Sequence, residues 1–236
     1  PMRRSILIIA ILVLVTQRSS AKELPRGLIT LSGVRSKVEV TSGSETYRVR
    51  NGTQLVEGVS IHVGMGARVV MMLANGAALL VIGEAKVHVE NFEILPFESP
   101  QKSLYDMKRE PSFSRTVLAI PYGEFFCEVK VLDARSRFVI KTSFSSVSPL
   151  PNPYLLKTSF YVLSRKGEQP SIASWHGRIG IELPNGEIRA VNGDSHIFLG
   201  NGKTPRIARG LEWSYVKMLE RHMNEVHRRQ KKFRFR

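Results

Sequence analysis

Five Asn-Gly pairs constrain the fold of this chain more than any other feature of its sequence. They lie at residues 51–52, 75–76, 185–186, 192–193 and 201–202. Asn-Gly readily adopts the positive φ angles that a tight type I′ β-hairpin turn requires. Short runs between the turns, such as Val38-Glu39-Val40, alternate apolar and polar residues with the period of a half-buried strand. We therefore expect an all-β fold of stacked short strands over residues 28–200, arranged as a sandwich or in a solenoid-like manner.

Two of these turns belong to a partial internal repeat. Residues 68–76, RVVMMLANG, align with residues 178–186, RIGIELPNG, and share Arg, Leu, Asn and Gly at the same offsets. Val81 and Val191 then agree at equal distances beyond the two glycines. Each copy has the pattern of a strand, a turn and a returning strand, although two hairpins do not make a repeat array. We expect the two copies to form the same structural unit.

Two segments interrupt the strand pattern. Residues 96–114 are polar and contain Pro100 and Pro111, so they are expected to form a long surface excursion with one helical turn near Leu104. Residues 145–153 contain three prolines, which predicts a rigid extended connection. Strands resume in the same style after each segment, so neither is expected to mark a domain boundary.

The spacing of apolar residues changes after Gly210 to steps of three and four. Such spacing places side chains on one face of a helix, here Leu211, Tyr215, Leu219, His222 and Val226. We expect one C-terminal α-helix from about Glu212 to Gln230, docked by Trp213, within a basic segment that spans residues 201–236. His222 and His227 are five residues apart, which predicts that they lie on different helix faces.

The amino terminus has the layout of a secretory signal peptide. Arg3 and Arg4 precede an unbroken apolar run from Ile6 to Val15, and small residues follow at positions 19–21. As a helix this run would rise only ~15 Å, which is too short for a hydrocarbon core of about 30 Å. We expect residues 1–21 to direct export to the periplasm or cell envelope, with cleavage after Ala21. The alternative is an uncleaved segment that anchors the chain in the inner membrane.

A spaced pattern of glycines and apolar residues resembles the FecR domain of bacterial envelope proteins. It is carried by Gly33-Val34, Gly52, Leu55, Gly58, Ile61, Gly64, Ala67, Val69, Met71, Leu73, Asn75-Gly76 and Leu79, and later by residues 138–142, 156–160 and 175–179. The resemblance implies a non-enzymatic all-β domain in the periplasm or outside the cell. The best-known members regulate sigma factors and carry a cytoplasmic segment and a transmembrane helix before the domain. Only a few residues precede the apolar run here, which favours the stand-alone exported members.

Residues that would carry chemistry show no catalytic pattern. No serine lies in a G-x-S-x-G elbow, no Walker or Rossmann glycine pattern occurs, and the strand histidines His62 and His88 are far apart in sequence. We therefore expect no cofactor, no metal site and no enzymatic activity. Cys127 is the single cysteine, so the fold must rest on core packing, and its apolar neighbours predict that it is buried.

Basic residues concentrate at the carboxyl end. The last 31 residues contain ten Lys and Arg against three Glu, in a chain whose formal net charge is +15. The predicted anion-binding residues are Arg228, Arg229, Lys231, Lys232, Arg234 and Arg236, interleaved with Phe233 and Phe235. In the cytoplasm this pattern would favour nucleic acid. For an exported chain no nucleic-acid partner is expected, and anionic lipid or wall polymer remains, at about 1 kcal/mol per base. A solvated tail that only aids solubility is the alternative.

These features predict a non-enzymatic exported protein that binds an envelope protein or glycan and docks its basic tail on an anionic envelope polymer or membrane. One alternative is a regulator of envelope signalling that contacts a receptor or a sigma-regulatory partner. A carbohydrate-active enzyme on a β scaffold is the other.

Overall fold

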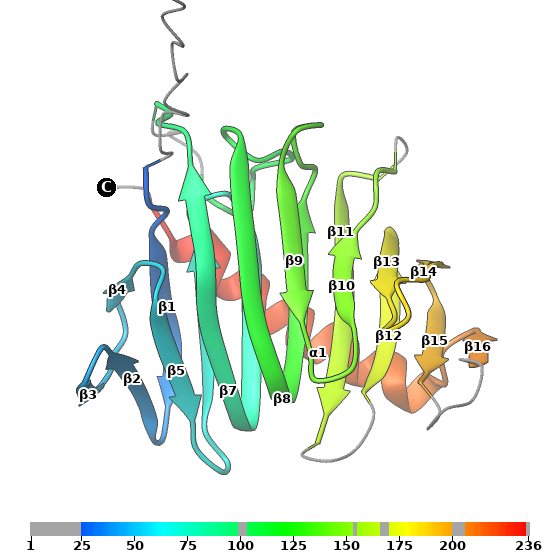
Figure 1. Ribbon diagram of the computed structural model, residues 1–236, viewed down its shortest axis with the longest axis horizontal. Coiled ribbons are helices and arrows are strands. Elements are labelled where there is room, and N and C mark those ends of the chain that lie inside the picture. Colours follow the sequence, from blue (N-terminus) through cyan, green and yellow to red (C-terminus); the bar gives the residue numbers. More distant parts are fainter. Residues whose placement is uncertain (1–24, 99–102, 153–154, 166–169, 200–205, 235–236) are drawn as a thin grey trace, which may run out of the picture.

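Sixteen β-strands and one α-helix make up the described part of the chain, which comprises residues 25–98, 103–152, 155–165, 170–199 and 206–234 of a computed structural model (Figure 1). The expected all-β fold with one C-terminal helix is confirmed. The segment 1–21, predicted to be a signal peptide, lies outside the described residues. In chain order the elements are β1 (Ile29–Arg35), β2 (Val38–Ser42), β3 (Glu45–Arg48), β4 (Gln54–Leu55), β5 (Val59–Val63), β6 (Arg68–Leu73), β7 (Ala78–Ile94), β8 (Ser114–Lys130), β9 (Arg137–Lys141), β10 (Ser146–Pro149), β11 (Lys157–Ser164), β12 (Ser171–His176), β13 (Arg178–Glu182), β14 (Ile188–Asn192), β15 (Ser195–Phe198), β16 (Arg206–Arg209) and α1 (Trp213–Lys232).

Two long strands, β7 and β8, run through both layers of a β-sandwich and join them. The first part of β7 pairs with β6, and its later part pairs with β5. The early residues of β8 run parallel to β9, whereas its later residues run antiparallel to β11. The outer layer has the strand order β3-β2-β5-β7-β8-β9-β10-β13-β14, and the helix-side layer has the order β4-β1-β6-β7-β8-β11-β12-β15-β16. The sandwich is therefore the architecture that forms.

The corner of β8, where the strand passes from one layer to the other, requires a glycine. Inward-facing side chains are even-numbered before the corner, as at Leu118, and odd-numbered after it, as at Phe125. Between them Gly123 has a φ of +132°, and a Cβ atom at this position would lie 2.4 Å from the Cβ of Ala85. Both the backbone conformation and the close approach of β7 thus exclude a side chain here.

The core between the two layers is built from alternate residues of each strand. The helix-side layer contributes Ile29 and Leu31 of β1, and the outer layer contributes Val38 and Val40 of β2. Cys127 is buried in the same core, as expected, and this burial raises the pKa of its thiol.

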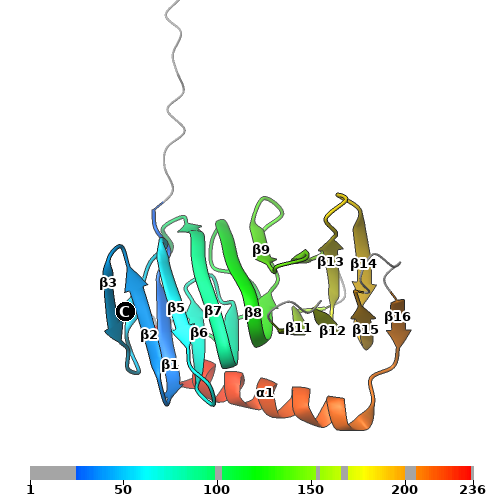
Figure 2. The same cartoon turned by 60° about the horizontal axis from the view of Figure 1, so that its bottom comes forward.

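Helix α1 forms a third layer, which covers the outside of the helix-side layer (Figure 2). The strands beneath it are apolar on both faces, because Val69 and Met71 of β6 point into the sandwich whereas Val70 and Met72 point to the helix. A continuous apolar run is typical of a strand that is buried on both sides. A second core therefore lies between sheet and helix, and its buried members are Val70, Met72, Ala78, Leu80, Leu104, Phe126, Tyr161, Leu219 and Val226.

Both copies of the internal repeat form hairpins of identical register. Met72 pairs with Ala78 in the first, and the equivalent Glu182 pairs with Ile188 in the second. The expected type I′ turn is wrong, because a positive φ is found at each glycine but not at the preceding asparagine. Each loop instead has three residues and ends on a left-handed glycine, which is the next most common hairpin connection.

The two segments expected to lack strands are partly ordered by tertiary contacts. Ser146–Pro149 forms strand β10, so the expectation of a purely extended connection over residues 145–153 is wrong. Its central position between β9 and β13 explains the difference, since both neighbours offer backbone hydrogen-bonding groups. In the segment 96–114, a turn forms at residues 104–106, but Leu104 is buried under α1 and does not lie on the surface.

Candidate anion-binding site

The basic residues predicted at the carboxyl end are mostly helical. Arg228, Arg229, Lys231 and Lys232 lie in the last turns of α1, and Arg234 follows directly after it. Arg236 lies outside the described residues. The structure therefore gives five of the predicted residues defined positions on or beside a helix that is fixed to the sheet.

Apolar side chains on one face of α1 dock the helix. Leu219 and Val226 are fully buried against the sheet, and Tyr215 packs edge-on against Tyr161 of β11 with ring centroids 5.6 Å apart. The expectation that Trp213 would dock the helix is wrong, since 68% of this residue is exposed and Lys217 lies over its ring. Trp213 occupies the first helical position, where it projects beyond the sheet-facing stripe.

Ion pairs add to this docking along the helix. Arg68 of β6 contacts Glu225 with an Nη1–Oε2 distance of 2.9 Å. Nε2 of His222 lies 3.5 Å from Oε1 of Glu124 on β8, and the imidazole lowers the pKa of this carboxyl. His227 also faces the sheet, so the expectation that the two histidines lie on different faces is wrong. The helix is close enough to the sheet that side chains five residues apart both reach β8.

The strongest polar contact of α1 is with the buried carboxylate of Glu128. His227 donates to its Oε2 at 2.8 Å, and Lys157 and Lys130 donate to Oε2 and Oε1 at 2.8 and 3.0 Å. Burial alone would raise the pKa of Glu128, but the hydrogen bond of His227 and the two ammonium charges outweigh it and hold this pKa well below its ordinary value. The carboxylate therefore stays ionised and ties the end of the helix to β8 and β11.

Sequence reasoning missed this cluster, although one signal was present. In the run Phe126 to Lys130, the two charged residues Glu128 and Lys130 occupy the same strand face as Phe126. Charges on an otherwise apolar strand face are rarely buried without partners, so they indicate a polar contact with another element. The partner, His227, lies 99 residues away in sequence, and nothing in the sequence indicates that it contacts Glu128.

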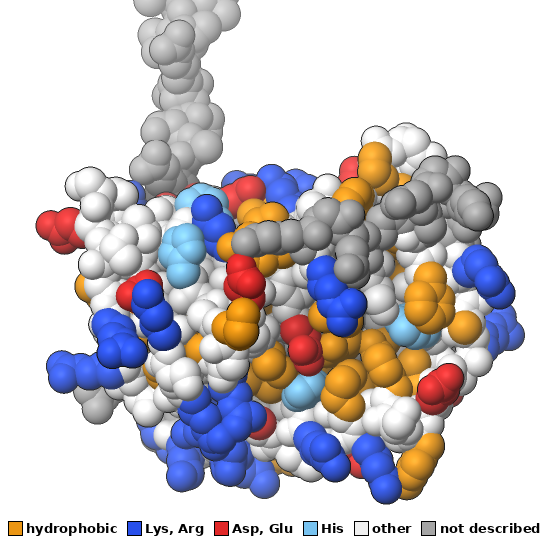
Figure 3. Space-filling view, turned by 90° about the horizontal axis from the view of Figure 1, so that it is seen from below, with side chains coloured by type: hydrophobic (Ala, Val, Ile, Leu, Met, Phe, Trp, Pro, Cys, Tyr) orange, Lys and Arg blue, Asp and Glu red, His pale blue; other side chains and the backbone are white. Residues whose placement is uncertain are grey.

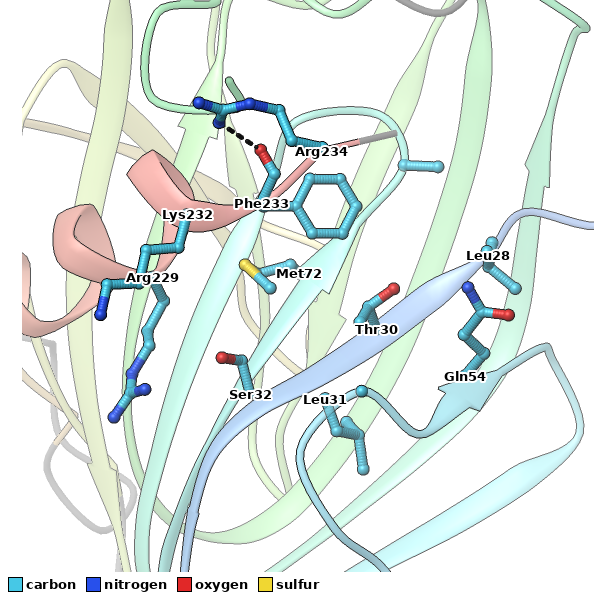
Figure 4. Close-up of a pocket in the computed structure, with 12 residues that line it drawn as sticks. Leu28, Thr30, Leu31, Ser32, Gln54, Met72, Arg229, Lys232, Phe233 and Arg234 are labelled. Carbon is cyan, nitrogen blue, oxygen red and sulfur yellow. Dashed lines mark hydrogen bonds between the residues drawn. The ribbon is translucent and has the colours of Figure 1, made fainter. Parts of the chain in front are cut away.

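A cleft of about 410 Å³ opens where the end of α1 meets β1 (Figure 4). Its strand wall carries Thr30 and Ser32 of β1 and Gln54 of β4, all with side chains that donate hydrogen bonds. Its helix wall carries the cationic side chains of Arg229, Lys232 and Arg234. Leu28, Met72, Ala74 and Phe233 add apolar surface, and Gly52 and Leu31, whose side chain belongs to the sandwich core, complete the lining. No aspartate or glutamate is among the described residues that line it.

Gly33 of β1 determines how closely Arg229 can approach the strand. A Cβ atom on Gly33 would lie 2.9 Å from Nε of Arg229, and Gly33 has a φ of +62°. The absence of a side chain lets the guanidinium lie directly on the strand backbone. The long side chain of Arg229 is thereby held at the mouth of the cleft.

Arg234 and two further predicted bases make contacts with the protein itself. Arg234 donates from Nη1 to the backbone carbonyls of Lys231 and Phe233 at 2.8 and 2.9 Å, which offsets the negative end of the helix dipole. Nζ of Lys231 lies 4.5 Å from the centre of the Tyr105 ring. Arg228 turns away from the cleft, toward Glu225. Three of the six predicted residues thus line the cleft, although the guanidinium of Arg234 also caps the helix, and Arg228 and Lys231 lie elsewhere.

The arrangement suits an anion more than a cation. Guanidinium and ammonium groups bind phosphate and carboxylate oxygens, and hydroxyl and amide donors can complete their coordination. Within the described ranges, no three His, Cys, Asp or Glu side chains come together as a metal site would require. Nor does any described helix have the length and apolarity needed to cross a membrane.

Comparison with known proteins leaves the family open. No family model matches the chain, and no curated protein matches its sequence. Two crystal structures of a putative anti-sigma factor from Parabacteroides distasonis are similar in part, with 14% identity over 68% of this chain and TM-scores of 0.47 and 0.48. The chain spans only 64% and 63% of the lengths of those two structures. These likenesses establish neither a family nor a function.

Proposed function

We propose that the protein is a non-enzymatic binding module of the cell envelope that holds a phosphate group of an envelope component in the cleft between α1 and β1. The observation that supports this function is a cleft lined by Arg229, Lys232 and Arg234 together with hydroxyl and amide donors, with no acidic side chain among its described lining residues. A phosphate needs several donors and positive charge, and the cleft offers both.

The FecR resemblance and the expected export fit this proposal. Outside the cytoplasm the abundant phosphates belong to lipid head groups and to anionic wall polymers. The apolar lining from Met72 and Phe233 would contact the part of the ligand that carries the phosphate. Export itself is testable by fractionation, because intact chain with residues 1–21 still attached and free in the cytosol would contradict it.

The decisive test compares two pairs of charge-removing substitutions. Lys232→Gln with Arg234→Gln removes two cleft charges. Arg206→Gln with Arg209→Gln removes two exposed charges on β16, at the opposite end of the same layer from β1 and β4. Binding would be measured to vesicles containing phosphatidylglycerol and to a soluble glycerol-phosphate polymer, since the two arms identify the source of the phosphate.

We expect the cleft pair to weaken binding by roughly 25-fold, from about 1 kcal/mol per charge. The β16 pair should leave binding within about twofold of the unchanged protein. Equal losses in both pairs would show that net charge, not the cleft, holds the anion. The alternative of a regulator that contacts a receptor or sigma-regulatory partner remains a prediction from the sequence.

A further inference from the structure

A second basic hollow lies beside the cleft. Four arginines surround it, Arg35 at the end of β1, Arg68 at the start of β6, and Arg221 and Arg228 on α1, with Asn224 and Glu225 completing the lining of a depression of about 430 Å³. Arg35 and Arg68 are paired across the two strands. Of these four arginines, only Arg228 belongs to the anion-binding residues predicted from the sequence.

The hollow has more positive charge than its own carboxylate can balance. Glu225 is its one acidic lining residue, and it is contacted by Arg68 at 2.9 Å and by Arg228 at 3.8 Å. Arg35 and Arg221 have no ion-pair partner among the described residues, and both are exposed. Guanidinium groups of like charge in one depression repel each other, so an anion that enters it lowers their electrostatic energy.

The hollow and the cleft adjoin each other along both α1 and β1. Arg228 lines the hollow and the next residue, Arg229, lines the cleft. On the strand, Ser32 lines the cleft and Arg35 lines the hollow, with Gly33 beneath the Arg229 side chain between them. Seen from below, Lys and Arg side chains gather densely on one part of the surface (Figure 3).

The length of this surface limits what can bind to all of it. Arg221 and Lys232 are eleven residues apart on α1, which corresponds to roughly 16 Å along the helix axis. One phosphate group cannot contact both ends of such a distance. A chain with several phosphates can place one in the cleft and others in the hollow.

We propose that the cleft and the arginine hollow form one continuous track that binds a linear phosphate polymer. This inference rests on the proposed function of the cleft and names its ligand as an extended chain with repeated phosphates. The track consists of two depressions lined by basic side chains, and a flexible strand can enter both of them. A flat lipid surface would meet the exposed Arg35 and Arg221 but not the deeper lining of the cleft.

The test removes charge from the hollow alone. Arg35→Gln with Arg221→Gln changes two exposed side chains that make no ion pair among the described residues, and Arg206→Gln with Arg209→Gln is the matched control on β16. The probes are long-chain inorganic polyphosphate, pyrophosphate and vesicles containing phosphatidylglycerol. Binding is measured over a range of salt concentrations, and circular dichroism establishes that each variant is folded.

We expect the hollow pair to weaken binding of the long chain by roughly 25-fold and to reduce its salt dependence, with pyrophosphate binding unchanged. Arg35→Lys with Arg221→Lys keeps both charges and should recover most of the affinity. Unchanged affinity for the long chain in the Gln pair would overturn the track. So would a loss for the vesicles as large as that for the polymer, which would indicate a membrane-docking surface.

The two proposals fail in different ways. If the cleft pair, Lys232→Gln with Arg234→Gln, leaves pyrophosphate and polymer binding unchanged, the proposed function is wrong. If the cleft pair weakens both while the hollow pair affects neither, the cleft stands and only the track is wrong.

Discussion

The two hairpins of the internal repeat have the same local structure in different surroundings. In each, the glycine nitrogen of the turn donates to the carbonyl of the leucine three residues earlier at 2.9 Å, and the side-chain oxygen of the asparagine accepts from the nitrogen two residues later, at 3.1 Å for Asn75 and 3.0 Å for Asn185. The first hairpin, β6–β7, is covered by the sandwich on one face and by α1 on the other. The second, β13–β14, lies at the edge of the outer layer, where Glu182 and Ile188 are exposed.

The turn is therefore encoded by neighbouring residues, whereas the burial of the strands depends on which element covers them. The helix-facing Met72 of the first hairpin corresponds to Glu182 of the second, and Leu80 corresponds to Ala190. Where no helix lies over the sheet, these two outward positions are charged or small, although the outward Ile188 is apolar and exposed. The helix therefore accounts for the apolar composition of the first copy.

Substitutions at the corresponding positions 72 and 182 should give the largest difference in stability between the two hairpins. Met72→Glu places a carboxylate in the apolar core under α1 without a partner, and we expect a loss of about 4 kcal/mol in the free energy of unfolding. Glu182→Met, the reverse change, should alter this free energy by no more than about 0.5 kcal/mol, because its site is exposed. Urea unfolding of both variants measures the difference. Equal effects would show that α1 does not cover β6.

Loss of the Glu128 charge should weaken the packing of α1 on the first hairpin. Glu128→Gln keeps the shape but leaves the ammonium groups of Lys130 and Lys157 without their carboxylate, at a cost of about 3 kcal/mol. Hydrogen exchange should then increase in α1 and β6 before it increases in β13 and β14. Arg189→Gln removes an exposed pair with Glu187 and serves as the control. A uniform increase throughout the chain would contradict a specific role in docking.

Substitutions of the two turn asparagines, Asn75 and Asn185, should give a smaller difference in unfolding free energy. Asn75 also donates from Nδ2 to the hydroxyls of Ser114 and Thr116, both at 3.1 Å and both buried. Asn75→Ala leaves these hydroxyls with fewer partners, so we expect a cost of about 2 kcal/mol in unfolding free energy. Asn185→Ala loses one exposed hydrogen bond and should cost about 0.5 kcal/mol. Thermal melting of the two variants measures both costs. A larger loss of stability in Asn185→Ala than in Asn75→Ala would contradict the prediction.

Mild acid should have the smallest effect on stability. This effect should arise at β12, the strand before the second hairpin. Burial, together with the charge of Lys157, lowers the pKa of His176 below its ordinary value of 6.5. Protonation then favours the unfolded chain, so stability is complete above about pH 6.5 and declines as pH falls below it. Glu128 stays ionised in this window because its own pKa is lowered. Melting temperatures of the unchanged protein and of His176→Asn between pH 7 and 5 test this, and a stability that rises on acidification would contradict it.

The sequence was most informative where structure is set by neighbouring residues. The Asn-Gly turns predicted both hairpins, and the period of apolar residues after Gly210 predicted α1 to within two residues at its end. The turn type was missed because the left-handed conformation is confined to the glycine. The docking role predicted for Trp213 was wrong because the direction of the first helical turn depends on how the whole helix lies on the sheet.

The site was predictable only on its helix side. The density of bases identified Arg229, Lys232 and Arg234, but not that they share one cleft while Arg228 faces another hollow. The strand side, with Thr30 and Gln54, has no signal in sequence, since hydroxyl and amide residues are common on strand faces. What brings the two sides together is the packing of α1, which depends on contacts between residues far apart in the chain.

The passage of β7 and β8 through both layers has a consequence for how the molecule can come apart. Each of these strands forms backbone hydrogen bonds with neighbours in both layers. Separating the layers therefore requires the loss of strand pairing along both β7 and β8. Global unfolding of either layer therefore disrupts strand pairing in the other. Heating or denaturant should therefore give one sharp, concerted transition for the whole sandwich, and cutting any single loop should leave no half able to survive alone.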